Sequence, residues 1–402
     1  MSPGAGSTGK IGLCLSGGGF RATVFHLGVL ARLAEQHCLE DVELVSTVSG
    51  GSLAAALVMA NNGMRWPTSA EYLNRVLPAA REKVTTQDLQ GALIGDVLRF
   101  PLRLFHTRAD ELSHELQKRL AVTGRLSDLP ERPRWIINST CYETGRNWRF
   151  ERDCMGDSSF GHSADTWIPV SDAVAASCGF PGLVGPLVLD TRQHSWKKPE
   201  GRVRSQLAFS RLHLWDGGVC DNLGVEGMHS FLNGWEQNVD LLMISDGCAR
   251  VRPEPYRTWK AADRLIRGLM LEEIRSLRFR AIVERARNHD DQACYFLIGS
   301  SCQDVLRFTG REGDIDRISS TVQSDRDRER AAYFGTTIRR LRQSEFECLF
   351  RHGFEVADYT MYGCYPERFR YLGYDHSRAC LEQPEPVSRH TWMQRVRVAL
   401  QG

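Results

Sequence analysis

The strongest constraint on the fold is a pair of glycine turns within the first 52 residues of the chain. The first turn, Ser-Gly-Gly-Gly at residues 16–19, follows the apolar run Ile-Gly-Leu-Cys-Leu at 11–15. The second turn, Ser-Gly-Gly-Ser at 49–52, follows an apolar pair at 44–45 and precedes the helix-forming run Leu-Ala-Ala-Ala-Leu. Strand, tight turn and helix therefore follow one another twice, which predicts an α/β domain.

The second turn has the residues that a nucleophile on a sharp elbow requires. A serine hydroxyl at a strained strand-to-helix turn is exposed for attack, and the backbone doubles back there, so only small neighbours fit. Gly50 and Gly51 supply that room after Ser49. The common G-x-S-x-G pattern has glycine two residues before the serine, and here Thr47 takes that place. The turn predicts an acyl-transfer nucleophile.

The first turn supplies backbone donors for an anion. Successive N–H groups of Gly17, Gly18 and Gly19, at the start of a helix, can converge on one negative charge, and Arg21 adds a positive charge nearby. Donors that face a developing oxyanion contribute about 3–4 kcal/mol each to catalysis. The alternative is a phosphate-binding loop, but the spacing is not G-x-G-x-x-G, and no acidic residue follows at the distance that a nucleotide site needs.

A third segment offers a base for the serine. The short apolar strand at 212–215 ends in Asp216 and two glycines, which leave the carboxylate beside open backbone where it could accept the proton of Ser49. An ordinary Asp-Gly turn is the alternative interpretation. Asp246, also followed by glycine at a strand end, is a second candidate. His26, within the first helix, needs no role beyond packing.

Four stretches in this order resemble the patatin-like phospholipases, relatives of the cytosolic group-IV phospholipases A2. They are residues 16–22, the Ser49 elbow, residues 173–182 (Ala-Val-Ala-Ala-Ser-Cys-Gly-Phe-Pro-Gly) and residues 216–224 (Asp-Gly-Gly-Val-Cys-Asp-Asn-Leu-Gly). The resemblance spans about residues 10–360. It implies a Ser–Asp dyad without histidine, in which Ser49 is the nucleophile and Asp216, rather than Asp246, is the base.

The same resemblance implies further roles and the fold. Gly18 and Gly19 offer oxyanion N–H groups, with Arg21 in support. The expected fold is the three-layer patatin-like α/β architecture, a central and mostly parallel sheet flanked by helices. We expect a flexible stretch at 1–10 and a single domain at 11–402.

Residues 63–130 interrupt the α/β order and are expected to form a helical cap insertion. Within them, residues 88–105 carry an apolar stripe that includes Leu93 and Leu98, flanked by Arg99 and Arg103. Such a stripe either packs on the main sheet or forms a mobile lid that covers Ser49 and touches lipid.

Composition excludes several classes of function. With 51 basic and 49 acidic residues, global charge does not indicate a nucleic-acid partner. None of the 12 cysteines falls in a C-x-x-C pattern, which favours free thiols over a zinc site, and we expect no metal or cofactor. No apolar run approaches the ~20 residues that span a membrane, so we expect a cytoplasmic protein that meets the membrane peripherally.

One further segment could contact a partner. Residues 250–288 carry eleven Arg or Lys against five Asp or Glu, within a long helix expected at about 256–287. This helix could meet anionic headgroups or a partner, or it could be a solvated outer face with an apolar stripe on the other side.

The predicted function is hydrolysis of lipid acyl esters, with membrane phospholipids as the expected substrates and a neutral-lipid esterase as the near alternative. Two other classes stay open: a catalytically weak lipid-binding protein of the same fold, and a signal-gated phospholipase effector of a bacterial defence system. A homo-oligomer and a small-molecule activator are compatible with the second of these.

Overall fold

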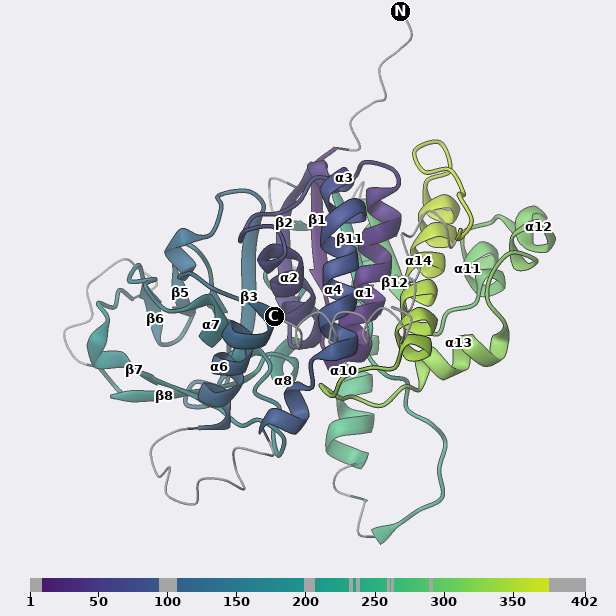
Figure 1. The fold of residues 1–402 in the computed structure, drawn as a ribbon. Helices are drawn as coiled ribbons and strands as arrows, with labels where there is room; N and C mark the ends of the chain where they lie inside the picture. Colours follow the sequence, from purple (N-terminus) through teal and green to yellow (C-terminus); the bar gives the residue numbers. More distant parts are fainter. Residues whose placement is uncertain are drawn as a thin grey trace, which may run out of the picture.

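A computed structural model describes residues 9–93, 107–198, 207–230, 234–235, 239–258, 261, 264–288 and 292–375 (Figure 1). The strands are β1 Ile11–Leu15, β2 Val42–Val48, β3 Arg134–Cys141, β4 Arg146–Phe150, β5 Met155–Asp157, β6 Gly161–Ser163, β7 Leu187–Asp190, β8 Arg211–Asp216, β9 His229–Ser230, β10 Gly234–Trp235, β11 Leu241–Asp246 and β12 Gln292–Leu297. The helices are α1 Gly19–Ala34, α2 Gly50–Ala60, α3 Ser69–Glu71, α4 Leu77–Thr86, α6 Arg108–Leu120, α7 Val170–Ser177, α8 Gly218–Asp221, α10 Leu271–Asn288, α11 Cys302–Phe308, α12 Ile315–Ser319, α13 Asp325–Ala332 and α14 Gln343–Cys364. Two π-helical segments, η2 Tyr72–Val76 and η6 Arg264–Met270, precede α4 and α10.

The central sheet is mixed, and its parallel part holds the predicted strand–turn–helix units. Its order is β12-β11-β1-β2-β3-β4-β5-β6, and β8 pairs with both β3 and β7. The pairs from β12 to β3 are parallel, whereas every pair beyond β3 is antiparallel. The predicted fold class, a large central sheet flanked by helices, is confirmed, although the sheet is mixed rather than mostly parallel.

Two apolar clusters on opposite faces of the sheet make the three layers. Along β1, Ile11 and Leu13 belong to the larger cluster, while Cys14 between Leu13 and Leu15 belongs to the smaller one. Helices α1, α2, α4 and α14 cover the larger cluster, and α10 contributes Ile282 to the smaller (Figure 1). Strands buried on both faces are mostly apolar, which explains the continuous apolar run of β1.

Two glycines let α1 and α14 pack closely. A Cβ added at Gly28 of α1 would overlap the carbonyl oxygen of Phe350, and one added at Gly353 of α14 would overlap that of Phe25. The sequence predicts Gly353 as the cap of a helix over 331–351. That prediction is wrong, because α14 begins at Gln343 and continues through Gly353 to Cys364. Every residue of α1 is buried, since this helix lies between the sheet and α14.

Two other boundaries and the burial of one loop residue differ from the sequence-based expectation. Helix α7 begins at Val170 after Pro169, not after Ser171 or Asp172. Tyr256, the expected start of the long helix, lies in a non-helical stretch, and the helix is described as η6 and α10 from Arg264 onward. Within the expected solvated loop at 190–208, Trp196 is buried in an aromatic cluster.

The described part of the expected cap insertion packs against the main body. The Tyr72 hydroxyl donates to the carbonyl of Leu27 at 2.7 Å, and Val76, Val84 and Leu93 are buried. Most of the predicted lid, including Leu98, Arg99 and Arg103, lies outside the described residues. The mobile lid therefore stays a prediction. The expected flexible stretch 1–10 is described only from Gly9 onward.

The expectation of free thiols is confirmed for the described residues. All eleven cysteines there are unbridged, and seven of them are buried. In the same part of the chain no helix is long and apolar enough to cross a membrane.

Candidate active site

Ser49 occupies a strained elbow between β2 and α2. Its backbone φ is 50° and its ψ is −113°, a region that residues with a side chain rarely adopt and that costs about 1–3 kcal/mol. The two following glycines have no room for a side chain. A Cβ at Gly50 would overlap the carbonyl oxygen of Gly19, and a Cβ at Gly51 would overlap that of Leu15. The elbow and the glycine loop after β1 are thus packed backbone to backbone.

A series of hydrogen-bonded hydroxyl groups anchors the elbow. The N–H of Ser49 donates to Oγ of Ser177 at 2.9 Å, and Ser177 in turn lies 2.8 Å from Oγ of Ser52. The Ser52 hydroxyl lies 2.9 Å from that of Thr47, which accepts from the indole N–H of Trp135 at 3.0 Å. Thr47, the departure from the common elbow pattern, is therefore a buried member of this network.

Strand β3 brings Asp216 to the elbow. Val48, which precedes Ser49, is in register with Asn138, and the next residue of β3, Ser139, is in register with Asp216. The Ser49 side chain lies close enough to the Asp216 carboxyl group to lower its pKa, and both residues line one cavity. Two residues that lie far apart in the sequence are thereby placed side by side at one end of the sheet.

The Asp216 carboxylate is buried, with few partners. Its Oδ1 accepts the N–H of Gly218 at 2.8 Å. Burial raises the pKa of Asp216 to about 6, and the N–H of Gly218 and the nearby Ser49 side chain offset only part of that rise. A carboxylate with a pKa near neutrality is a better proton acceptor for a hydroxyl than an ordinary aspartate.

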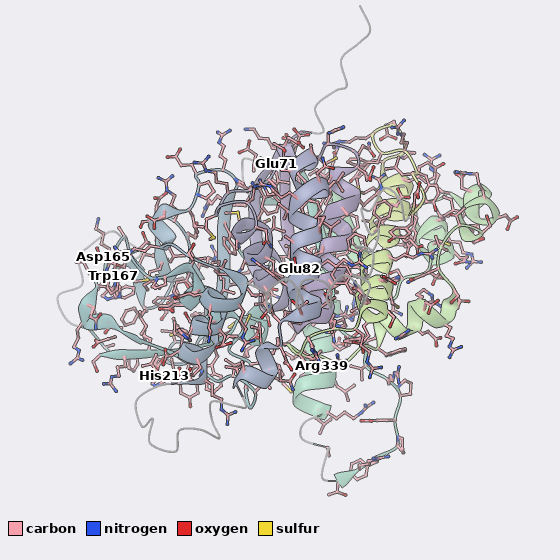
Figure 2. The ribbon with its side chains drawn as sticks, in the orientation of Figure 1. Glu71, Glu82, Asp165, Trp167, His213 and Arg339 are labelled. Atoms are coloured by element: carbon pink, nitrogen blue, oxygen red, sulfur yellow. The ribbon has the colours of Figure 1, made fainter. Side chains whose placement is uncertain are left out.

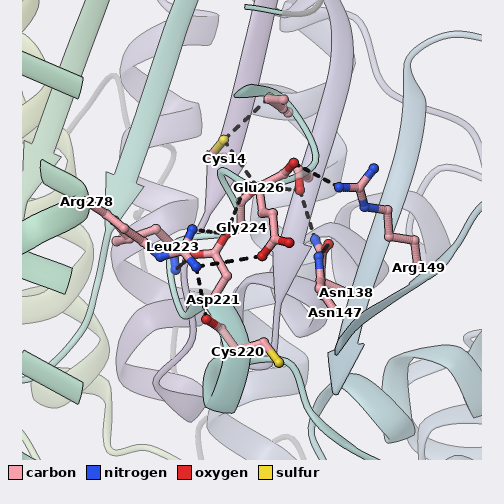
Figure 3. A network of polar contacts seen from close by, with 12 residues as sticks. Cys14, Asn138, Asn147, Arg149, Cys220, Asp221, Leu223, Gly224, Glu226 and Arg278 are labelled. Atoms are coloured by element: carbon pink, nitrogen blue, oxygen red, sulfur yellow. Dashed lines mark hydrogen bonds and ion pairs between the residues drawn. The ribbon is translucent and has the colours of Figure 1, made fainter. Parts of the chain in front are cut away.

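A polar network fixes the chain that follows Asp216 (Figure 3). The Asp221 carboxylate accepts the N–H groups of Leu223 at 3.1 Å and Glu226 at 2.7 Å, and Arg278 of α10 lies 3.6 Å from it. The carbonyl of Gly224 accepts the Ser46 hydroxyl of β2 at 2.6 Å. The loop that carries Asp216 is thus tied to the strand that carries Ser49.

The three glycines of the first turn are not equivalent. The Gly17 N–H donates to the carbonyl of Asn222 at 3.0 Å, so this donor is already engaged. Gly18 and Gly19 have φ values of 140° and 60°, and both line the cavity that contains Ser49. Within the described part of the chain, the N–H groups of Gly18 and Gly19 have no recorded acceptor.

His26 anchors this turn from behind. Its Nε2 lies 2.9 Å from the carbonyl of Ser16 and therefore donates, while Nδ1 accepts the Ser245 hydroxyl at 2.7 Å. Burial lowers the pKa of His26 to about 4, so the imidazole is neutral. The predicted packing role of this histidine fits its place in the core.

Arg21 lies at the same turn and is almost completely buried. Its Nε donates to the carbonyl of Gly247 at 2.9 Å, and its Nη1 donates to the carbonyl of Phe334 at 2.7 Å and to Thr336 at 3.1 Å. Nη2 lies so close to Gly18 that a Cβ there would overlap it. Burial lowers the pKa of Arg21 to about 10, which still leaves the guanidinium charged at neutral pH.

A cavity of about 180 Å³ contains Ser49, Asp216, Gly18, Gly19 and Arg21. Its remaining walls are mostly apolar and come from segments far apart in the sequence: Leu53, Phe180, Leu183, Val184, Val219, Val251, Leu271 and Ile338. The predicted pocket segment at 173–182 contributes Cys178 and Phe180, as expected. The cavity can hold an apolar chain beside the serine hydroxyl.

The second aspartate candidate has a different environment. Asp246 accepts Nη1 of Arg275 at 2.6 Å and the hydroxyl of Tyr295 at 2.6 Å. Burial alone would raise the pKa of Asp246, but the charge of Arg275 and the hydrogen bonds from Cys248, Tyr295 and Arg275 together lower it. Asp246 is not among the residues that line the cavity.

Among the described residues, no histidine lines the cavity with Ser49. His213 is near in sequence, since it precedes Asp216 by three residues on β8. An odd separation along a strand places the two side chains on opposite faces. His213 binds Glu143 at 2.5 Å and lies on the same side of the molecule as Trp167 (Figure 2).

Two features of the site cannot be identified from the sequence alone. Ser177 lies in a predicted helix, but no spacing rule connects it with Ser49. Thr336, Thr337 and Ile338 come from a segment expected to be helical, whose carbonyl at Thr337 accepts the N–H of Phe20 at 2.8 Å. Only an alignment or a structure could have identified them.

Comparison with known proteins identifies related chains. The family model for patatin-like phospholipases matches residues 13–229. The curated triacylglycerol lipase ptl2 of Schizosaccharomyces pombe is 29% identical over 225 residues, which is 51% of this chain and 31% of that protein. A patatin-like phospholipase domain-containing protein of Neosartorya fischeri is 26% identical over 228 residues, 51% of this chain and 28% of its own length. The chain thus spans about a third of the length of these relatives.

Among solved structures, human GIVD cytosolic phospholipase A2 is similar with a TM-score of 0.51 and 13% sequence identity. The similarity covers 90% of this chain and 62% of the human protein. At this level of identity the comparison establishes a shared fold.

Proposed function

Because this chain belongs to the patatin-like phospholipase family, we propose that it hydrolyses carboxylic ester bonds of membrane phospholipids through Ser49 and Asp216. The observation that carries the proposal is that Ser49, at a strained elbow, and the buried carboxylate of Asp216, whose pKa is about 6, line the same cavity. Both groups open into one largely apolar cavity. Nucleophile, base and acyl-binding walls are then present together.

In the first half of the reaction, Oγ of Ser49 attacks the ester carbonyl carbon and its proton moves to Asp216. The carbonyl oxygen becomes an oxyanion, which the N–H groups of Gly18 and Gly19 can bind because no described group occupies them. The charge of Arg21 beside Gly18 favours the same oxyanion. When the tetrahedral intermediate collapses, Asp216 returns the proton to the departing alcohol oxygen.

In the second half, water replaces the alcohol. Asp216 accepts a proton from water as the water oxygen attacks the acyl-enzyme carbonyl, and the proton then returns to Oγ of Ser49 as the fatty acid leaves. A single carboxylate suffices for both halves because it exchanges the same proton in each direction. The buried, weakly partnered environment of Asp216 suits this repeated transfer.

The apolar walls support a fatty acyl chain as the bound part of the substrate. They do not distinguish a phospholipid from a triacylglycerol, and the relative named as a triacylglycerol lipase makes neutral lipid the second candidate. We favour phospholipid because the chain belongs to the patatin-like phospholipase family.

The decisive experiment measures fatty acid released from phosphatidylcholine vesicles, triolein emulsion and a short soluble ester. We expect Ser49→Ala and Asp216→Ala each to lose at least roughly 10³-fold in activity, and the double variant to lose little more, because the two residues act as one unit. A fluorophosphonate probe should label Ser49 of the wild-type protein and leave Ser49→Ala unlabelled.

Each other result selects a different function. Undiminished hydrolysis by Ser49→Ala would reject the nucleophile. Lipid binding by a correctly folded protein without any hydrolysis or labelling would favour the lipid-binding alternative. Faster release from triolein than from phosphatidylcholine would assign the enzyme to neutral lipids.

A further inference from the structure

Helix α10 and the preceding η6 expose large apolar side chains. Met270, Ile274 and Leu277 are 57%, 38% and 54% exposed, and their spacing of four and then three residues places them on one helical face. We call these three residues the outer stripe. Leu265 and Leu269 of η6 are also exposed, at 54% and 43%. The sequence predicts that this apolar stripe packs against the rest of the protein, but in the structure it faces outward.

Charged groups fix α10 in this orientation. Arg275 is the inward residue of the helix, 9% exposed, and its Nη1 binds the buried Asp246 at 2.6 Å. One turn further on, Arg278 lies 3.6 Å from the Asp221 carboxylate and donates to the carbonyl of Cys220 at 3.1 Å. Rotating α10 to bury the outer stripe would break both contacts and leave Asp246 unpaired in the core, which is costly.

The outer stripe lies next to the cavity that contains Ser49. Gly268, Leu271 and Glu272, from the same stretch of helix, line that cavity. Val219 of α8 also lines it and is 48% exposed. The cavity is therefore bordered by the helical stretch that carries the outer stripe and by the exposed Val219, and exposed apolar surface of this kind marks an interaction site.

We propose that the outer stripe is the surface by which this protein docks on a phospholipid membrane that contains anionic lipid. The proposal rests on the function proposed above and deepens it, since it names the surface that meets the substrate. A bilayer fits this position because it can cover the stripe and still deliver single lipids to the adjoining cavity. A protein seated there would cover residues that border the cavity.

Charge supports the choice of an anionic surface. Residues 250–288 carry eleven Arg or Lys against five Asp or Glu. Arg264 and Arg280 flank the outer stripe along the chain. Each is partly exposed and pairs with a glutamate, Glu254 and Glu273 respectively, so the attraction comes from the excess of basic residues in the segment. Basic side chains around inserted apolar residues add attraction to anionic headgroups, and salt weakens that attraction.

The test measures vesicle binding in the Ser49→Ala background, so that binding is separated from hydrolysis. We expect sedimentation with vesicles of phosphatidylcholine and phosphatidylglycerol, and weaker sedimentation with phosphatidylcholine alone. Ile274→Gln combined with Leu277→Gln should lower binding by at least roughly tenfold, because two apolar side chains no longer leave water. The matched control is Phe308→Gln, at a residue 60% exposed on α11, which should bind like the parent.

The same substitutions in the active protein separate this proposal from the proposed function. The Ile274→Gln/Leu277→Gln variant should keep its rate on a short soluble ester and lose hydrolysis of vesicle lipid. Equal vesicle binding by this variant and the control would overturn the docking surface, whatever the esterase assay shows. A failure of Ser49→Ala to abolish the soluble-ester rate would reject the proposed function and leave the binding result standing.

A second measurement requires no substitution in α10. On vesicles, hydrogen exchange of peptides from 264–288 in Ser49→Ala should slow, while peptides from α11 should not change. Absence of that protection would overturn the proposal. A concentration-dependent dimer in solution that Ile274→Gln/Leu277→Gln converts to monomer would also overturn it, by assigning the stripe to a second copy of the chain.

Discussion

The backbone N–H of Ser49 donates to the hydroxyl of Ser177 at 2.9 Å across 128 residues of sequence. The bond joins the strained elbow to the last residue of α7, and the same hydroxyl contacts Ser52 in the first turn of α2. Strain at a functional residue persists only where its surroundings fix the conformation. Ser177 is therefore a positioning residue for Ser49. This role does not require Ser177 to contact the reacting atoms.

We expect Ser177→Ala to lower kcat on a soluble ester by roughly tenfold and to destabilise the fold by about 1–3 kcal/mol, because the Ser49 N–H loses its acceptor. The matched control is Ser171→Ala on the same helix, where a buried hydroxyl accepts from Ser113 at 2.9 Å and Gln117 at 2.7 Å. That control should lose stability without losing kcat. Equal kcat for the two variants in urea-free buffer would contradict the positioning role.

Gly51→Ala should prevent the elbow from closing against β1, because the added methyl group would overlap the Leu15 carbonyl. We expect a loss of more than about 3 kcal/mol in urea unfolding, comparable with severe core overpacking. Gly313→Ala is the control, since a Cβ there meets no atom within 4 Å. A normal unfolding midpoint for Gly51→Ala would show that the two turns can separate at little cost.

The rate on a soluble ester should depend on the ionisation of Asp216. Its carboxylate must be unprotonated to accept the Ser49 proton, and its pKa is about 6. We therefore expect kcat/KM to fall about tenfold for each pH unit below about 6 and to level off above it. A pH profile flat from pH 5 to 8, with the protein folded throughout, would contradict Asp216 as the base.

Stability should show the opposite trend with pH. The pKa of Asp216 is raised from 3.8 to about 6 on folding, so the folded protein holds this proton more tightly and loses stability as pH rises through that window. Asp216→Asn should relieve about 2–3 kcal/mol of this cost at pH 8 and almost none at pH 4. Asp153→Asn, at a side chain 86% exposed, is the control and should show no such pH-dependent gain.

Arg21 combines a structural role at the glycine turn with a positive charge beside Gly18, and two variants separate these roles. Arg21→Met removes the charge beside Gly18 as well as the bonds to Gly247 and Phe334. Thr336→Val removes only the hydroxyl partner of Arg21. If charge stabilises the oxyanion, Arg21→Met should lower kcat by roughly 10²-fold with a smaller change in KM, while Thr336→Val keeps kcat within a few-fold. Parallel losses of kcat and thermal stability in both variants would favour a purely structural role.

Much of the architecture follows from short-range sequence information. The apolar runs at 11–15 and 241–244 predict buried strands, because a strand covered on both faces is mostly apolar. Gly50 and Gly51 predict the elbow, since only glycine tolerates backbone so close by. The sequence also singles out Ser49 and Asp216 as residues at strand ends, where functional groups of α/β folds lie.

Contacts between distant segments were decided by the tertiary structure alone. No local pattern connects Ser177 with Ser49, or reveals that Asn222 engages the N–H of Gly17. The outward orientation of Met270 and Leu277 depends on Arg275 finding a buried partner in Asp246. Periodicity identifies which residues of a helix share a face, but which face turns inward depends on the free energy of pairing buried charges across the whole fold.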